Sequence, residues 1–463
     1  MSKKLHYFDV NGLGEAIRYM LHYGGEKFED IRVEYKDLPT LKKSLPYGQL
    51  PLYEEGDRKL NQSIAISRYI ASQTGLLPSD PWEQAVLDSV ALNITDFRLK
   101  MYPILLEKDE ARKTQLKTEF LTETVEYYLS RMEKELKDNK GFFGGKLSWA
   151  DFYVVGILET VNLVLSAEVE KNYPTITALM NKIRTLPGVK EYIAKRKPYV
   201  FPILLLLTYP KVVYVQHSSV QYSLFPEVGQ KFGLAGDVAA DGDRLNNSLC
   251  AATNGLSKMS KKLLYFSIGG IAEYIRYMLH YGGHNFEDVR FDYKKWPIKE
   301  VKDSLPYGQL PLYEEGDRKL NQSIAISRYI ASQTGLLPSD PWEQAILDAA
   351  VLNVNDFRLK SYSYFIEKDE TKKEQIKKEF LTDSVDFFLS RFEKELKDNN
   401  GHFGGKLSWA DFYLVGMLEG INLAMNVQLE KNYPSITALM KEIPSLPGVK
   451  EYVAKRGPYV FPA

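Results

Sequence analysis

The chain has almost no cysteine, since only Cys250 occurs among its 463 residues. One cysteine cannot form an intrachain disulfide, and it cannot supply the Cys-x-x-Cys pair of structural metal sites and dithiol redox sites. The six histidines lack the spacing of a metal-binding motif, so we expect no metal site. Any sulfur chemistry carried out here therefore needs a sulfur atom brought by a substrate or cofactor.

A net charge is also lacking, because 60 lysines and arginines balance 60 aspartates and glutamates. No overall field attracts nucleic acid or an anionic membrane surface, so we expect neither as a partner and expect a small substrate instead. The most apolar stretch, residues 199–215, contains Pro202, Pro210 and Lys211. It is shorter than the roughly 20 residues of a membrane-spanning helix, and we interpret it as a docked tail that runs into a linker.

The sequence consists of two copies of one unit. The segment that begins at Met1 recurs from Met259, and residues 44–85 are identical to residues 304–345 over all 42 positions. A period near 260 residues is far longer than the roughly 20–50 residues of solenoid repeats, so this is a duplicated unit and not an array. Between the copies, residues 203–258 lack periodicity, and we predict a disordered linker there.

The origin of the linker stays open at this point. Its length would let the two copies associate with each other within one chain. Because the second copy keeps what looks like its own start at Met259, the linker also fits a spacer translated between two neighbouring genes.

The first third of each copy alternates between strand and helix patterns, which indicates a small mixed sheet with helices on its faces. We predict this domain over residues 1–79 and 259–339. In the first copy the expected strands are residues 5–8, 28–35, 50–53 and 58–60, and the expected helices end at Gly24 and Gly75, the second one capped by Ser63.

The remainder of each copy is entirely helical in pattern, and we predict helical domains over residues 80–202 and 340–463. Residues 82–107 and 111–136 are long amphipathic segments. The tetrapeptide Ser148–Asp151 has the form of a capping box that opens a further helix. The predicted fold class is thus a duplicated two-domain unit, an α+β domain followed by an all-α domain.

Four motifs, each present in both copies, resemble those of the cytosolic glutathione transferases. They are Tyr7-Phe8, Tyr47–Pro51, Asn61–Ile66 and Ser148–Phe152, which recur as Tyr265-Phe266, Tyr307–Pro311, Asn321–Ile326 and Ser408–Phe412. They are most similar to the sigma class, which includes glutathione-dependent prostaglandin D synthases and many insect enzymes. The resemblance implies a thioredoxin-like domain before each helical domain, a cytoplasmic protein, and either a homodimer or an intramolecular pseudo-dimer of the two copies.

The resemblance also implies the site residues. The catalytic tyrosines are Tyr7 and Tyr265, and cis-prolines are expected at Pro51 and Pro311. A Gln-Ser pair holds the γ-glutamyl carboxylate of glutathione, and an acidic residue reaches across the dimer. The candidate glutathione-binding residues are Lys42, Gln49, Leu50, Pro51, Gln62, Ser63 and Asp96 in the first copy, and Trp296, Lys302, Gln309, Leu310, Pro311, Gln322, Ser323 and Asp356 in the second.

The expected chemistry is the stabilisation of a thiolate. A free thiol has a pKa near 8.5, so a shift of about two units needs roughly 2.7 kcal/mol of preference for the charged form. One charge-assisted hydrogen bond from a tyrosine hydroxyl, helped by a helix N-terminus, is of that size. Basic residues soon after the catalytic tyrosine are common in the vertebrate enzymes, but Asn11, Leu13, Gly269 and Ile271 stand here, which argues against prostaglandin isomerase specificity.

The predicted function is conjugation of glutathione to small apolar electrophiles. The alternatives are a glutathione-dependent prostaglandin isomerase, a peroxidase, and a non-catalytic crystallin-like glutathione-binding protein. We expect the electrophile between the domains, against residues 82–107 and the tail at 199–201. Residues 101–105 and 361–365 differ in sequence, which predicts different electrophile preferences, although neutral drift on a helix surface is the alternative.

Overall fold

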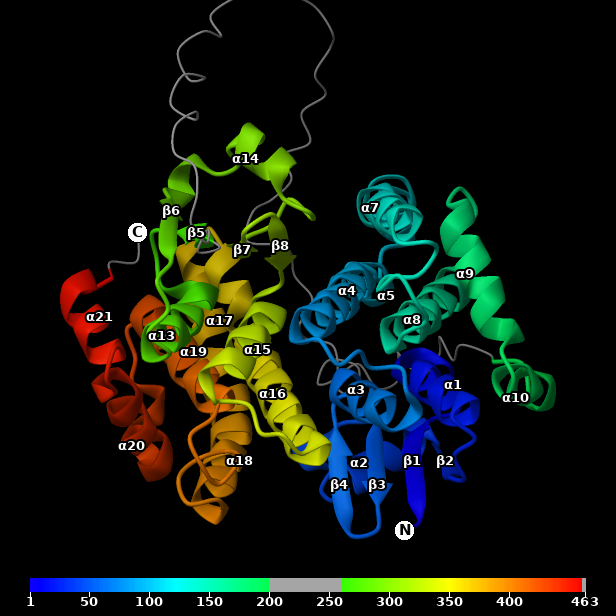
Figure 1. Cartoon of the computed structure of the whole chain (residues 1–463), viewed down its shortest axis with the longest axis horizontal. Helices are drawn as coiled ribbons and strands as arrows, with labels where there is room; N and C mark the ends of the chain where they lie inside the picture. Colours follow the sequence, from blue (N-terminus) through cyan, green and yellow to red (C-terminus); the bar gives the residue numbers. More distant parts are fainter. Residues whose placement is uncertain (200–259, 460–463) are drawn as a thin grey trace, which may run out of the picture.

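The computed structural model describes residues 1–199 and 260–459, which include both copies (Figure 1). The predicted linker and Cys250 fall outside this part of the chain. Each copy contains a four-stranded mixed sheet followed by a set of helices. The predicted fold class is confirmed.

The candidate tyrosine of each copy stands on a central strand of its sheet. The strand orders are β2-β1-β3-β4 and β6-β5-β7-β8, with β1 parallel to β2 and antiparallel to β3. In β1 the side chains of Leu5 and Tyr7 are buried and those of Lys4 and His6 are partly exposed, the two-residue period of a strand that packs one face on a core. The strands are β1 (Lys3–Phe8), β2 (Glu29–Val33), β3 (Leu52–Glu55) and β4 (Arg58–Asn61), then β5 (Lys261–Phe266), β6 (Glu287–Phe291), β7 (Leu312–Glu315) and β8 (Arg318–Asn321).

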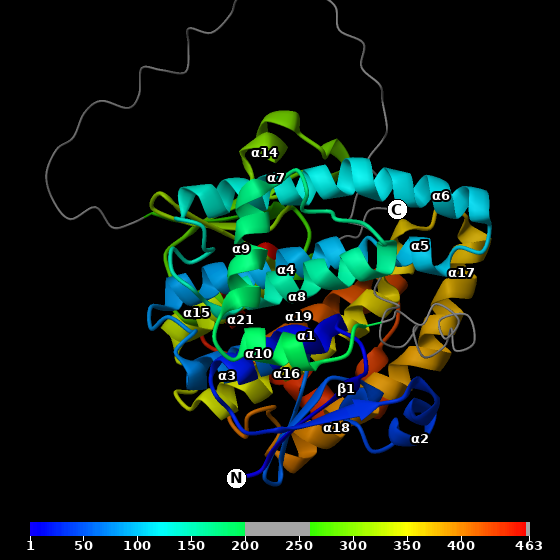
Figure 2. The ribbon, with the colours of Figure 1, turned by 90° about the vertical axis from the view of Figure 1, so that its right-hand side faces the viewer.

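In the first copy, helix α8 connects the two domains, because it packs against α1 of the sheet domain and α4 of the helical domain (Figure 2). The helices of the first copy are α1 (Glu15–Tyr23), α2 (Leu38–Leu41), α3 (Ser63–Thr74), α4 (Pro81–Leu99), α5 (Tyr102–Leu106), α6 (Glu110–Glu119), α7 (Val125–Asp138), α8 (Trp149–Leu165), α9 (Pro174–Thr185) and α10 (Val189–Lys195). Those of the second are α13 (Glu273–Tyr281), α14 (Lys299–Ser304), α15 (Ser323–Thr334), α16 (Pro341–Ile366), α17 (Glu370–Glu379), α18 (Val385–Asp398), α19 (Trp409–Met425), α20 (Pro434–Glu442) and α21 (Val449–Arg456).

The predicted capping box at the start of α8 is confirmed. The Ser148 amide and hydroxyl donate to the Asp151 carboxylate at 2.7 and 2.8 Å, and the Phe143 amide donates to it at 3.1 Å. The same arrangement opens α19 in the second copy. Asp151 thus ties the loop before α8 to the first turn of the helix.

The prediction of one helix over residues 82–107 is wrong in the first copy and right in the second. In the first copy α4 ends at Leu99 and α5 begins at Tyr102, whereas α16 runs unbroken to Ile366. Pro103 stands where the second copy has Ser363. Proline has no amide hydrogen, and its ring clashes with the carbonyl four residues earlier, so the helix breaks there. Residues 111–136 lie within one continuous helical stretch, in which α6 and α7 are joined without a break by a π-helical turn over Phe120–Thr124.

The two copies pack against each other through their sheet and helical domains. Helix α3 contacts α16, and α15 contacts α4. Trp82 lies edge-on against Tyr329, and Trp342 lies edge-on against Tyr69, each pair with ring centres 4.9 Å apart. Figure 1 shows the first copy, in blue to green, beside the second, in green to red. Across both described segments, no helix is long and apolar enough to cross a membrane.

Candidate functional site

A cleft of about 1160 Å³ lies between the two copies and is lined by both of them. All but one of the candidate glutathione-binding residues lie on its wall. Those residues are Gln49, Leu50, Pro51, Gln62, Ser63, Asp96, Trp296, Lys302, Gln309, Leu310, Pro311, Gln322, Ser323 and Asp356. The exception is Lys42, whose ammonium lies 6.0 Å from the ring centre of Phe387 in the second copy. The structure therefore brings together residues that are hundreds of positions apart in sequence.

The Tyr7 hydroxyl accepts a hydrogen bond of 2.9 Å from the Leu13 amide, in the turn before α1. Because this amide uses one acceptor position, the hydroxyl keeps its own proton to donate elsewhere. Leu13 lies on the wall of the cleft, as does its counterpart Ile271, whose amide bonds to Tyr265. Neither Tyr7 nor Tyr265 is among the residues that line the cleft, and each is joined to its wall through the hydrogen bond to Leu13 or Ile271.

Both tyrosines are protonated at neutral pH. Burial raises the pKa of Tyr7, and it raises that of Tyr265 to about 12, with the amides of Leu13 and Ile271 as the main opposing influence. A neutral phenol donates a hydrogen bond and does not act as a general base, so the site is suited to stabilising an anion.

A glycine is required beside each hydroxyl. Gly12 has a φ of 46°, and a Cβ atom there would lie 2.4 Å from the Tyr7 hydroxyl oxygen. Gly270 occupies the matching position, where a Cβ atom would lie 2.8 Å from the Tyr265 oxygen. Any larger residue would push the tyrosine away from the amide that orients it.

The glutamines before α3 and α15 reach into the opposite copy. Gln62 donates to the Asp356 carboxylate at 2.9 Å, and Gln322 donates to that of Asp96, also at 2.9 Å. Both glutamines have a positive φ, 71° and 68°, a conformation that is uncommon outside glycine and costs roughly 1–3 kcal/mol. The chain sustains this strain at two matching places, which is typical of residues held in position for binding.

The two aspartates stand where the helices α4 and α16 face the opposite sheet domain. Burial raises the pKa of Asp96 and of Asp356, and the hydrogen bonds from Gln322 and Gln62 oppose that rise. The Gln49 amide also donates to Asp356, at 3.3 Å. Each carboxylate therefore accepts at least one hydrogen bond from the opposite copy inside the interface.

Ser63 does not cap α3, contrary to the prediction. It is the first residue of the helix, and the N-cap position belongs to Gln62, which makes no capping hydrogen bond. The Ser63 hydroxyl pairs instead with the Tyr153 hydroxyl at 3.0 Å. The helix begins one residue later than a serine cap would place it, because Gln62 takes the N-cap position with an unusual backbone conformation that has no signal in the sequence.

The phenylalanine at the end of the first strand packs differently in the two copies, and only that of the second copy, Phe266, lies on the wall of the cleft. Phe8 stacks on Tyr35 with ring centres 4.0 Å apart, whereas Phe266 meets Trp296 edge-on at 5.4 Å. Trp296 precedes a cis-proline, Pro297, in the second copy only. The bonds before Pro51 and Pro311 are also cis, as the resemblance implied.

The tail does not line the cleft at Tyr199, contrary to the expectation. The Tyr199 hydroxyl donates to Glu15 of α1 at 2.8 Å and pairs with the Tyr192 hydroxyl, and none of these three residues lines the cleft. Phe201, at the end of the expected tail, lies outside the described residues.

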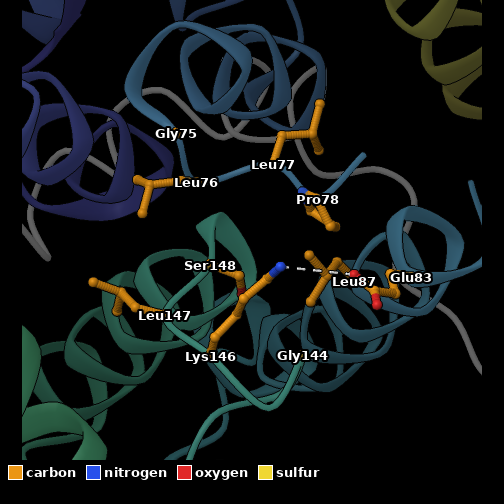
Figure 3. Close-up of a pocket in the computed structure, with 10 residues that line it drawn as sticks. All are labelled: Gly75, Leu76, Leu77, Pro78, Glu83, Leu87, Gly144, Lys146, Leu147 and Ser148. Atoms are coloured by element: carbon orange, nitrogen blue, oxygen red, sulfur yellow. Dashed lines mark ion pairs between the residues drawn. The ribbon is translucent and has the colours of Figure 1, made fainter. Parts of the chain in front are cut away.

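A second cavity, of about 140 Å³, lies where the end of α3 meets α4 and the loop before α8 (Figure 3). The Lys146 ammonium approaches the Glu83 carboxylate to 3.9 Å there. None of the predicted site residues lines this cavity. In the described residues there is also no group of three or more histidine, cysteine or carboxylate side chains placed to hold a metal ion.

The sequence reasoning missed Arg98, which lies on the wall of the cleft and is 7% exposed. The sequence carries no clear signal for its burial, because Lys100 stands between the same apolar residues Phe97 and Met101 and is only partly buried. It also missed Asn93 and Asn353, which accept hydrogen bonds of 2.7 Å from Gln322 and Gln62 across the interface.

The sequence matches family models of the glutathione S-transferases twice. The N-terminal domain matches residues 3–72 and 261–332, and the C-terminal domain matches residues 95–196 and 355–456. A glutathione S-transferase of Anopheles gambiae is 37% identical over 194 residues, which are 42% of this chain and 96% of that protein. The chain belongs to the glutathione S-transferase family.

Prostaglandin synthases match the chain with similar coverage. The hematopoietic prostaglandin D synthase of Gallus gallus is 35% identical over 193 residues, 42% of this chain and 96% of that protein. The solved structure of prostaglandin synthase D of Nilaparvata lugens is 39% identical and covers 43% of this chain and 100% of its own, with a TM-score of 0.41. The Anopheles gambiae and Gallus gallus proteins each align over nearly their whole length with 42% of this chain. Since both domain models also match twice, the chain is a tandem member of the family, similar to insect transferases and prostaglandin D synthases.

Proposed function

We propose that this chain conjugates the thiolate of glutathione to small apolar electrophiles, at one site in each copy. The observation that carries this proposal is the state of Tyr7. It is a buried, neutral phenol whose oxygen accepts from the amide of Leu13, a residue on the wall of the cleft, and whose own proton is available to donate. A donor of this kind stabilises a thiolate and leaves the sulfur free to attack an electrophilic carbon. Tyr265 has the same role in the second copy.

The walls of the cleft supply the remaining contacts for glutathione. Gln62 and Ser63 at the start of α3 are proposed to hold the γ-glutamyl carboxylate, because amides at a helix N-terminus favour an anion. Leu50 and Pro51 offer a strand edge for the peptide part. Asp356 from the other copy supplies a negative charge for the γ-glutamyl ammonium. Gln322, Ser323, Leu310, Pro311 and Asp96 do the same in the second site.

We further propose that the two copies function as an intramolecular pseudo-dimer. Support comes from the reciprocal hydrogen bonds of Gln62 with Asp356 and of Gln322 with Asp96. Since each site takes an acidic residue from the other copy, neither copy has a complete site alone. The cytoplasmic location that the resemblance implies remains a prediction.

A second candidate is glutathione-dependent isomerisation of a prostaglandin endoperoxide by the second copy. The aromatic pair Phe266 and Trp296 on the wall of the cleft favours it, because flat side chains pack well against a long apolar substrate. Both candidates use the same thiolate and differ in the electrophile that the cleft accepts.

Turnover assays test this proposal. The parent chain is expected to conjugate a chromogenic aryl halide to glutathione, and the chain with both Tyr7→Phe and Tyr265→Phe is expected to be slower by roughly 10²-fold, as for the loss of one aimed donor. Equal rates for the two chains would reject the role of the tyrosines. A chain that binds glutathione but turns over neither an aryl halide nor a prostaglandin endoperoxide would be the non-catalytic binding protein.

A further inference from the structure

The residues that follow each candidate tyrosine provide no cation. Asn11 and Leu13 follow Tyr7, and Gly269 and Ile271 follow Tyr265. A phenol alone is a weak partner for a thiolate compared with a phenol assisted by a positive charge. A basic group from another part of the chain would therefore change how strongly each site ionises the thiol.

The helical domain places such a group in the cleft of the first copy. Arg98 lies two residues after Asp96 on α4, lines the cleft, and is only 7% exposed. Its Nη1 donates to the Tyr102 hydroxyl. Its Nε is buried and has no hydrogen-bond partner among the described residues. A buried guanidinium with an unused donor is costly unless an anion comes close to it. The Asp356 carboxylate of the second copy is near enough for Arg98 to lower its pKa. It makes no hydrogen bond with Nε, which leaves this donor for a ligand with negative charge.

Arg98 also acts on Tyr7 more strongly than the other nearby arginine does. Arg98 lowers the pKa of Tyr7 by more than Arg18, although the guanidinium of Arg18 lies 5.6 Å from the centre of the Tyr7 ring. The donors of Arg18 are occupied by Asp30, Glu15 and two backbone carbonyls. Arg98 is thus the cation with capacity left for an anion beside the tyrosine.

The second copy has the equivalent arginine but holds it differently. Arg358 donates from Nε and Nη2 to the side-chain oxygen of Asn355, at 3.1 and 3.0 Å. The first copy has Thr95 at that position, whose hydroxyl donates to the Ala91 carbonyl and makes no such tether. At Tyr265 the order of influence is reversed, because Arg276 lowers the pKa more than Arg358 does.

We propose that Arg98 is a thiolate-stabilising residue of the first site, and that Asn355 restrains Arg358 so that the second site ionises the thiol less. This inference rests on the proposed function, since it concerns the sulfur of bound glutathione. It gives the bound thiol a different degree of ionisation at the two sites, although both sites have the same tyrosine, glutamine and proline residues.

The experiment uses the full chain with one site silenced at a time. Tyr265→Phe leaves the first site as the main source of turnover, and Tyr7→Phe leaves the second. The pH profile of kcat/KM with an aryl halide gives the apparent thiol pKa of each site. The first site is expected to have the lower value. Arg98→Gln in the Tyr265→Phe chain is expected to raise it by about one unit, the lower end of the effect of an opposite charge at short range.

Matched variants separate charge from structure. Arg98→Lys keeps the charge and is expected to keep most of the shift. Asn355→Thr in the Tyr7→Phe chain frees Arg358 and is expected to lower the second-site pKa, whereas Thr95→Asn in the Tyr265→Phe chain is expected to raise that of the first. S-methylglutathione has no ionisable thiol, so its dissociation constant, measured by calorimetry, is expected to stay the same in all of these chains.

The inference would be overturned by an apparent pKa that Arg98→Gln does not move, by equal pKa values for the two sites, or by position-95 and position-355 variants without effect. The last two measurements do not require a substitution at Arg98, so they test the inference even where Arg98→Gln fails to fold. A loss of S-methylglutathione binding in step with the pKa change would show a general binding role and would also overturn it. If the parent chain neither binds S-methylglutathione nor turns over an aryl halide, the proposed function itself fails.

Discussion

The side-chain amide of Gln62 donates a hydrogen bond of 2.9 Å to the carboxylate of Asp356, 294 residues further along the chain. Gln322 makes the matching bond to Asp96 at the same length. The polar groups that complete one candidate site therefore come from the helical domain of the other copy. The duplication places two such exchanges in a single polypeptide.

Because of this exchange, a substitution in the helical domain of one copy is expected to alter glutathione binding at the site of the other copy. Asp356→Asn is expected to weaken glutathione binding at the site of Tyr7, because Gln62 and Gln49 both donate to that carboxylate. The glutathione KM of the Tyr265→Phe chain, in which the first site turns over, is expected to rise about tenfold, the size of one hydrogen bond to a charged group.

The matched control is Asp96→Asn in the same Tyr265→Phe chain. It alters the acidic residue that lies in the same copy as Tyr7, yet its partner is Gln322 in the second copy. The KM of the first site is expected to stay within about twofold of its parent value. The reverse pattern would mean that each copy completes its own site.

Electrophile preference is expected to differ between the sites. The second site presents Phe365 and Tyr362 on an unbroken α16, where the first presents Pro103 and Ile104 after the break in the helix. The ratio of kcat/KM for a fused-ring aryl electrophile to that for a small alkyl electrophile is expected to be several-fold higher in the Tyr7→Phe chain, because aromatic contacts add about 0.5–1.5 kcal/mol each.

Replacing Phe365 by leucine, the residue of the first copy at that position, is expected to move this ratio toward that of the first site. Ratios that agree across a panel of electrophiles would support neutral drift of the helix surface instead.

Substitution of the capping-box residue Asp151 is expected to lower the free energy of unfolding and to leave kcat/KM of the folded protein unchanged. Asp151→Ala removes three buried hydrogen bonds at the start of α8 and is expected to cost about 1–3 kcal/mol of unfolding free energy. The urea midpoint of the unfolding transition that includes the first helical domain measures it. Asp411→Ala in α19 is the matched control, with a similar loss expected in the second copy. A fall in kcat/KM of the folded variant would show that the residue also shapes the site.

The contact between the copies is expected to depend on pH through Glu395. The Tyr47 hydroxyl donates to Glu395 at 3.0 Å, and burial raises the pKa of that carboxyl to about 7. The packed form thus holds a proton that a separated, solvated carboxyl with its ordinary pKa releases. The stability of the contact is fully present below about pH 4.5 and falls as the pH rises toward 7, by at most about 1.4 kcal/mol per pH unit.

The pH dependence of the urea midpoint, compared between the parent and Glu395→Gln, measures this. The amide carries no proton to release, so the fall between pH 5 and 7 is expected to be smaller in the variant. Identical pH profiles would show that other groups set the dependence.

Local patterns in the sequence predicted much of the fold. The alternation around Leu5 and Tyr7 located β1, and Ser148–Asp151 located the start of α8, since both depend on neighbouring residues. The unusual backbone of Gln62 and the break before Pro103 were not predicted. The Gln62 backbone has no local signal. The helix break has a signal in Pro103 itself, but the amphipathic pattern on both sides of it favoured one long helix.

Of the site residues, only those within recognisable sequence motifs could be predicted. Tyr7 and Gln62 stand within recognisable motifs, and the structure places their surroundings at the same cleft. Arg98 was missed because a charged residue on a helix is ordinarily assigned to the solvent side. The pairing of Gln62 with Asp356 inside one chain depends on how the copies pack, which no spacing within a copy specifies.

The most direct test of the central claim is the pKa of the glutathione thiol when it is bound to the chain, followed through the ultraviolet absorbance of the thiolate. In the parent the thiol is expected to titrate below its free pKa of about 8.5. With both Tyr7→Phe and Tyr265→Phe the titration is expected to move back toward that value while glutathione still binds. A bound thiol that ionises at the same pH with and without the two hydroxyls would contradict the account.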